Sequence, residues 1–147
     1  MNYSESDRQR LLSAAAEVVL ATMAADRTGP VAYFREMMAA GRYLYDAERQ
    51  YAHNPLVQAL LSGAHDPAPT EGEKKSLPRE QLLQRISEVG NIVQNDEEGV
   101  EFKRFLYGLA EHIAKASGPA FRSNISLDEQ EFLTELRTRL NFPESAA

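Results

Sequence analysis

Hydrophobic and polar positions follow a helical period along almost the whole chain. Apolar side chains recur at three- and four-residue steps over Leu11–Thr22, which predicts one amphipathic helix over about 4–25. Pro30 suits the first position of a second helix over about 30–52, because its missing N–H costs nothing there. Gly41 lies inside that second helix and argues against a single continuous rod.

The next segments carry clear start and stop signals. Asn54 and Pro55 predict a third helix that ends near Gly63. The segment 63–75 is polar, rich in Pro and Gly and without an apolar period, so we expect an exposed, mobile loop. A fourth helix is expected to follow Pro78, because apolar residues then recur on one face.

Two more helices complete the pattern. Acidic residues 96–98 favour the start of a fifth helix that ends near residue 116, because they complement the helix dipole. Ser126 and Glu129 form a capping box before a sixth helix that closes near Asn141. No run alternates with period two. The sequence therefore predicts an all-α fold, a compact bundle of six or seven helices in one domain over residues 1–147.

The apolar stripes also predict which side chains form the core. The first and fifth helices carry the least charge and should be central. The expected core residues are Leu12, Val19, Met23, Phe34, Leu82, Ile86, Leu106, Leu109, Ile113, Phe132 and Leu136.

Composition excludes several classes of protein. The 147 residues include no Cys, which rules out disulfides, a thiol nucleophile and Cys-based metal sites. The net charge of -6 argues against nucleic acid as the main partner. The most apolar run, Ala14–Ala25, is too short for a transmembrane segment, and the polar N-terminus lacks a secretory signal. We expect a cytoplasmic protein.

Catalytic motifs are also missing. No two of the eight Gly are closer than nine residues, which excludes phosphate-binding glycine loops and the nucleophile elbow. There is no HExxH and no helical Glu-x-x-His pair. We expect a protein that is not an enzyme.

Three groups of polar or aromatic residues have both a structural and a functional interpretation. The structural one is favoured for each: solvation or packing for the histidines, dipole compensation for the acidic group, and packing at the rim of the core rather than ligand stacking for the tyrosines. The groups are His53, His65 and His112; Glu97, Glu98 and Glu101; and Tyr43, Tyr45 and Tyr51 with Arg42 and Arg49. The basic residues Lys103 and Arg104 suggest no special role.

Two stretches of the chain resemble each other and a known family. Ala24–Pro30 and Ala114–Pro119 each close an apolar helix, and the stretch Phe105–Gly118 is followed by a short insert and Ile125–Leu133. This order of apolar helix, small residues with Gly, loop and acidic helix start resembles the tellurite-resistance TerB-like family. Residues 14–38 are a weaker echo of it.

The resemblance implies a fold and a role. TerB-like proteins are all-helical with two related halves packed face to face, which would correspond here to about 4–62 and 76–142. They are associated with tellurite resistance, other chemical stress and phage defence, and are regarded as non-catalytic. Binding of divalent cations, calcium in particular, has been proposed for their loop acids. Some members work beside membrane-embedded and calcium-binding partners, so the resemblance implies protein partners, membrane-associated ones included.

The implied cation site transfers only in part. Asp26 stands at the loop acid of the first half, with Glu36 displaced beyond it, and Asp128 and Glu129 hold the acidic helix start of the second half. Ser117 replaces the second loop acid. Calcium prefers six or more oxygens, so these residues would give weak binding at best. Asp128 and Glu129 also serve as helix-start residues.

Three hypotheses follow for function. The first is a non-catalytic TerB-like protein of the stress response that acts through partner contacts, with a weak divalent-cation site. The second is a structural or ligand-binding helical module of the same fold that has lost the metal site. The third is an enzyme with an unrecognised site, which would need a cleft where polar groups converge.

Overall fold

The computed structural model describes residues 3–25, 30–63, 79–116 and 127–142, and within its helices the side chains of 23–25, 30–36, 63, 79 and 127–128 are not described. This part of the chain is helical and contains no strand. The helices are α1 (Glu5–Leu12), α2 (Ala14–Ala25), α3 (Pro30–Gln50), α4 (Pro55–Gly63), α6 (Arg79–Ile92), α7 (Glu97–Ala116) and α8 (Leu127–Leu140). The predicted all-α fold is confirmed.

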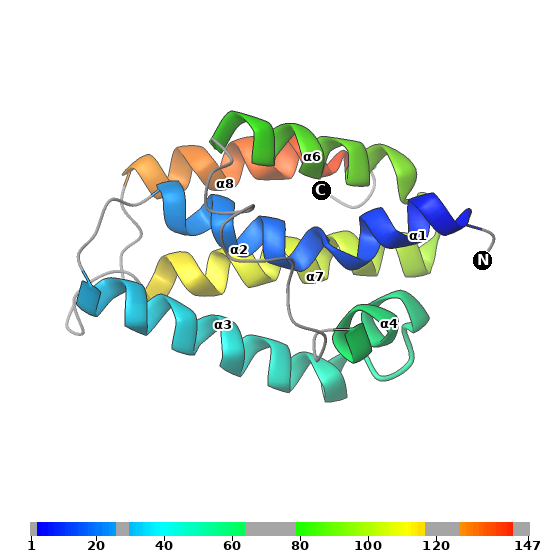
Figure 1. Cartoon of the computed structure of the whole chain (residues 1–147), viewed down its shortest axis with the longest axis horizontal. Helices are drawn as coiled ribbons and strands as arrows, with labels where there is room; N and C mark the ends of the chain where they lie inside the picture. Colours follow the sequence, from blue (N-terminus) through cyan, green and yellow to red (C-terminus); the bar gives the residue numbers. More distant parts are fainter. Residues whose placement is uncertain (1–2, 26–29, 64–78, 117–126, 143–147) are drawn as a thin grey trace.

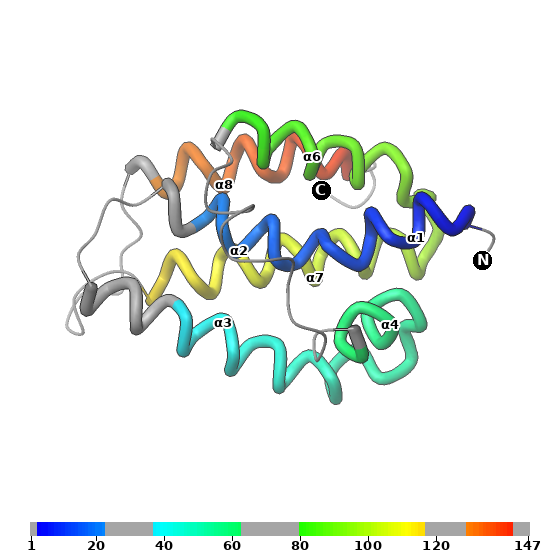
Figure 2. The backbone as a smooth tube through the Cα atoms, viewed as in Figure 1, coloured from blue at the N-terminus to red at the C-terminus, as the bar shows by residue number. Residues whose placement is uncertain are grey.

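The predicted first helix is wrong in one respect, because it is interrupted at Ser13. The Ser13 hydroxyl donates to the Arg10 carbonyl oxygen at 3.1 Å and competes with the regular backbone pattern. The chain nevertheless continues from α1 into α2 in nearly the same direction (Figure 2). Counted as one interrupted rod, α1 and α2 leave a bundle of six helices in the described residues.

Capping residues set the helix starts as the sequence predicted. The Asn54 side-chain oxygen accepts from the backbone N–H groups of Leu56 and Val57 at 3.0 and 3.1 Å, which caps α4. Asp96 caps α7 by accepting from the Gly99 N–H at 2.8 Å. In contrast, α3 is continuous through Gly41, so our reservation about that helix was wrong.

Helices α2 and α7 form the centre of the bundle. They pack against each other, with α6 and α8 along one side and α3 and α4 along the other (Figure 1). The predicted central placement of these two helices is confirmed. The described helices before residue 64 and those after residue 78 therefore interleave, since α2 packs on α6, α7 and α8.

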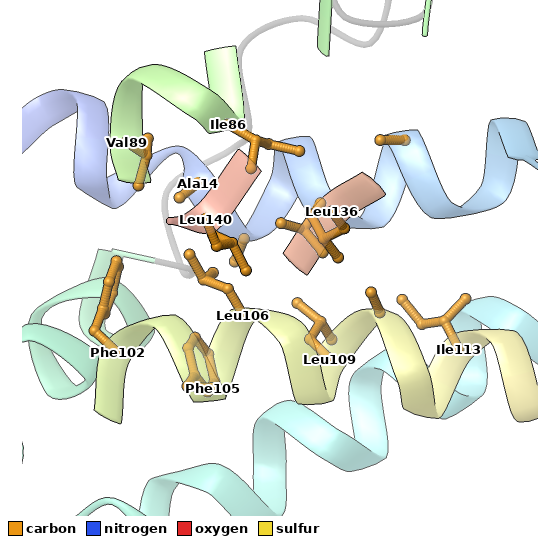
Figure 3. Packing of buried hydrophobic residues seen from close by; sticks show 14 of the residues in the cluster. Ala14, Ile86, Val89, Phe102, Phe105, Leu106, Leu109, Ile113, Leu136 and Leu140 are labelled. Carbon is orange, nitrogen blue, oxygen red and sulfur yellow. The ribbon is translucent and has the colours of Figure 1, made fainter. Parts of the chain in front are cut away.

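The core lies mainly between α7 and its neighbours. Leu106 and Leu109 of α7 face Leu140 and Leu136 of α8, whereas Phe105 points to the opposite side, toward α3 (Figure 3). Close approach of α6 to α8 depends on Gly90, where a Cβ atom would lie 2.5 Å from the Arg139 carbonyl oxygen and 2.8 Å from the backbone of Leu140. Any larger residue would force these helices apart.

Most of the expected core residues are buried, and one is not. Leu12 is 36% exposed, and its neighbour Leu11 is buried in its place, because Leu11 lies on the same helical stripe as the buried Ala15 and Val18 of α2. Val19 is only half-buried, while Met23 and Phe34 lie outside the described side chains. The buried ones are Leu82, Ile86, Leu106, Leu109, Ile113, Phe132 and Leu136.

Two predictions from the sequence concern the loop after α4 and the lack of a membrane-spanning helix. Of the loop expected over 63–75, Gly63 is instead the last residue of α4, and residues 64–75 lie outside the described part of the chain. Within the described residues, no helix is both long and apolar enough to cross a bilayer.

Candidate functional site

The outer face of α3 carries an exposed apolar strip. Met37, Met38 and Tyr45 are 45%, 49% and 70% exposed, and they lie at helical spacing around Gly41. A Cβ atom placed on Gly41 would meet nothing within 4 Å. We call these four residues the α3 strip. Helix α3, which carries the strip, lies at the edge of the bundle (Figure 1).

The opposite face of α3 explains why the strip points outward. Ala39, Ala40 and Ala47 are buried, and their small side chains let α3 lie close to α7. The Tyr43 hydroxyl donates a hydrogen bond to the Phe105 carbonyl oxygen of α7 at 2.9 Å. These contacts fix the rotation of α3 about its own axis, so residues half a turn away must face solvent.

Aromatic rings fill the seam between α3 and α7. Tyr43 stacks on Phe105 with ring centroids 5.8 Å apart, Tyr51 meets Phe105 edge-on at 5.8 Å, and His112 lies 5.6 Å from Tyr43. Burial raises the pKa of Tyr43 far above its ordinary value. The predicted packing role of Tyr43 and Tyr51 at the rim of the core is confirmed, whereas Tyr45 faces solvent.

A histidine and a glutamate join the end of α3 to α7. His53 Nε2 lies 3.0 and 2.9 Å from the two carboxylate oxygens of Glu101, and the Asn54 amide donates to the same carboxylate at 3.1 Å. The hydrogen bond from His53 is the main cause that lowers the pKa of Glu101. Because Asn54 also caps α4, this group ties two helix ends to α7. The expectation that Glu101 serves only the helix dipole was wrong.

Two buried charged side chains were missed by the sequence analysis. Glu17 is fully buried in α2 and pairs with the Arg85 Nε of α6, with a longer contact of 3.6 Å to Arg10. Lys103 is fully buried in α7 and donates to Asn95 Oδ1 at 2.9 Å and to the Asn141 carbonyl oxygen at 2.8 Å. Burial lowers the pKa of Lys103.

Both buried charges have a structural role in this arrangement. Glu17 links α2 to α6, and Lys103 joins the residue that follows α8 to the turn before α7. Lys103 also faces the C-terminal end of α8, where the helix dipole favours a cation. The signal that could have revealed Glu17 was its position inside an apolar run, and Lys103 had no comparable signal.

A groove separates α1 from α4. Its volume is about 200 Å³, and it is lined by Tyr3, Arg8, Leu11, Leu12, Pro55, Leu56 and Ala59. The Tyr3 hydroxyl accepts from the Gln94 N–H at 3.1 Å, which fixes the ring at one end. The lining has one cationic and one phenolic group and is otherwise apolar, so this groove offers space for one or two apolar side chains and no acid–base pair.

Of the four residues expected to bind a cation, only Glu129 has a described side chain. Glu129 is buried at 3% exposure in α8, whereas the side chains of Glu36 and Asp128 and all of Asp26 lie outside the described residues. Where side chains are described, no group of three or more metal-binding residue types forms. The cation site thus stays a prediction.

Compared with known proteins, the chain matches no family model, no curated protein and no solved structure. The resemblance to TerB-like proteins therefore rests on the residues quoted above alone.

Proposed function

We propose that this chain is a non-catalytic, TerB-like helical protein of the stress response that acts by binding protein partners through α3. Tellurite, other chemical stress and phage infection are the conditions that the resemblance implies. The observation that carries the proposal is the α3 strip.

The α3 strip gathers most of the large apolar side chains that are exposed in the described part of the chain. Among the described residues, Met37, Met38 and Tyr45 are three of the four large apolar side chains that stand exposed, the fourth being Leu12. Apolar side chains gathered in one place mark interaction surfaces more often than singly scattered ones do. Methionine adapts to different partners because its chain is flexible and polarizable, and tyrosine offers a large rigid contact.

A role without catalysis is supported by how the described ionisable side chains are used. Each of three groups is paired with a side chain or a backbone carbonyl from another segment of the bundle. They are Glu17, Lys103 and the His53–Glu101 pair. The α1–α4 groove offers no converging acid and base. Enzyme sites normally bring such groups together in a concave, partly dry pocket.

Cation binding is a secondary part of the proposal. We assign a weak site for a divalent cation such as calcium to Asp26, Glu36, Asp128 and Glu129, with carbonyls and water completing the shell. Thermal melting in EDTA and then in millimolar calcium, magnesium or manganese tests it, because a ligand bound only to the native state raises the midpoint. The rise should be lost in an Asp26→Ala, Asp128→Ala double variant. No shift with any of these metals would remove the cation from the proposal.

The alternative is a structural or small-ligand-binding module of the same fold without a metal site. The burial of Glu129 favours it, because a side chain packed in the core is poorly placed to meet an exchanging ion. The groove between α1 and α4 would then be the ligand site. A metal-independent melt, together with a normal stress phenotype for α3 variants, would favour this alternative.

Partner capture tests the main proposal. The parent chain, a Met38→Asp, Tyr45→Asp variant and a Thr134→Asp control on exposed α8 surface are each immobilised, and proteins retained from a lysate of the source cells are compared. We expect partners held by the parent and the control to be lost with the α3 variant. Equal retention by all three chains would contradict a role for the strip.

A further inference from the structure

We infer that α1 is a detachable strap, hinged at Ser13, that opens without unfolding of the rest of the bundle. This inference concerns a movement of the chain and does not depend on the proposed stress role.

The first observation is the small apolar anchor of α1. Of its eight residues only Leu11 is buried, while α7 buries nine. An isolated helix of eight residues is not stable in water, so α1 can persist only while it is held against the bundle. Segments with few buried apolar contacts open at lower free energy than the core does.

The second observation is that polar contacts hold α1 in place. Arg10 Nη2 donates to Glu88 Oε2 at 2.8 Å and to the Arg85 carbonyl oxygen at 3.0 Å, both on α6. At the other end of α1, the Tyr3 hydroxyl accepts from the Gln94 N–H. The Glu88 side chain is 54% exposed, so its ion pair with Arg10 is open to water and weakened by salt.

The third observation is the imperfect packing beneath α1. The groove of about 200 Å³ lies between α1 and α4, with Leu11 and Leu12 on one wall and Leu56 and Ala59 on the other. A gap of this kind forfeits the dispersion contacts that a closely packed helix would make with α4. Little apolar contact is therefore lost when α1 leaves α4.

The hinge is located by the interruption between α1 and α2. Ser13 N–H still reaches the Gln9 carbonyl oxygen, but at 3.3 Å, and the Ser13 hydroxyl bonds back to α1. On the far side of this residue, Glu17 is held by Arg85 and does not depend on α1 alone. Opening at Ser13 leaves α2 in the core and exposes the apolar walls of the groove.

Hydrogen exchange of the full chain under native conditions tests this inference. The amides of Arg8 to Ser13 are compared with those in the middle of α7, for the parent, for Glu88→Gln and for a Glu131→Gln control on exposed α8 surface. We expect the α1 amides to exchange at least about tenfold faster than those of α7. Glu88→Gln should speed exchange in α1 by roughly a further two- to fivefold, since exposed ion pairs stabilise weakly. Amides of α7 that exchange only by global unfolding should speed by no more than the same factor, because global unfolding breaks the same contact.

Two results would overturn the inference. Equal exchange rates in α1 and α7 would show that α1 opens only when the whole chain unfolds. No effect of Glu88→Gln on the exchange of α1 would show that the Arg10–Glu88 contact does not hold α1 to the bundle. The Glu131→Gln control should leave both helices unchanged, and added salt should act on α1 as Glu88→Gln does.

Discussion

His53 contacts both carboxylate oxygens of Glu101, at 3.0 and 2.9 Å, across 48 residues of sequence. The pair fastens the turn after α3 to α7, and Asn54 extends it to the start of α4. It sits at the end of the helix that carries the α3 strip, so it helps to hold that strip in position.

This pair predicts a pH dependence of stability in acid. The pKa of Glu101 is lowered in the folded chain, chiefly by the hydrogen bond from His53, from an ordinary value of 4.5. The contribution of this pair to the free energy of unfolding is therefore present above pH 4.5 and is lost as the pH falls through the pKa of Glu101 in the folded chain. It should be less than about 1 kcal/mol, because His53 is mostly exposed.

Urea unfolding of the parent and of Glu101→Gln between pH 3 and 7 measures it. The variant should lose stability at neutral pH and show a shallower decline in acid. Curves of stability against pH that ran parallel for the two chains, with a constant offset, would contradict the role of the Glu101 carboxylate. Glu97→Gln, on an exposed carboxylate of the same helix, serves as the control.

The buried Glu17 predicts an asymmetry between its variants. Replacing Arg10 and Arg85 together by Ala leaves the carboxylate buried without a charged partner, which should cost about 3 kcal/mol in the free energy of unfolding. Glu17→Met removes the charge and keeps the volume, so it should be nearly neutral. The urea midpoints of the variants measure these changes. A larger loss of stability in Glu17→Met than in the double variant would show that the ion network itself stabilises the fold.

Two glycines predict effects of opposite sign. Gly41→Ala should stabilise the chain by about 0.5–1 kcal/mol, because its Cβ atom meets open space within a helix. Gly108→Ala should destabilise it, because the new Cβ atom would collide with the Tyr43 hydroxyl and lie 3.2 Å from its Cζ, displacing the hydrogen bond to Phe105. Thermal midpoints that moved in the same direction would contradict the packing of α3 on α7.

The central place of α7 predicts that Leu109→Asp unfolds the protein. Leu109 is fully buried, and an unpaired charge there should cost at least about 4 kcal/mol. Met38→Asp introduces the same side chain on the exposed strip and should leave the melting temperature nearly unchanged. Circular dichroism melts of both variants make the comparison, and a parent-like melt for Leu109→Asp would show that α7 is misplaced.

Local signals in the sequence predicted much of the fold. Asn54 with Pro55, and the acidic start at Glu97, were sufficient to place α4 and α7, because capping depends on residues next to one another. The period of the apolar residues identified Leu109 as core, because that pattern is also set within one helix. The choice of Leu12 over Leu11 failed, although Leu11 lies at helical spacing from the buried Ala15 and Val18.

The site was harder to predict because its partners are distant in sequence. Lys103 can be buried only because Asn95 and Asn141, from two other segments, meet it there. Exposure of Met38 likewise depends on how α3 is rotated against α7, which the amphipathic pattern of one helix does not settle. The comparisons supply no relative from which these contacts could have been transferred.

The most direct test of the proposed role is growth of a deletion strain of the source organism under tellurite and under phage challenge. The strain carries the parent gene, the Met38→Asp, Tyr45→Asp variant or the Thr134→Asp control, each confirmed to melt like the parent. The account predicts that the parent and the control restore growth under at least one of these conditions and that the α3 variant does not. Full rescue by the α3 variant, or no growth defect in the deletion strain under either condition, would contradict it.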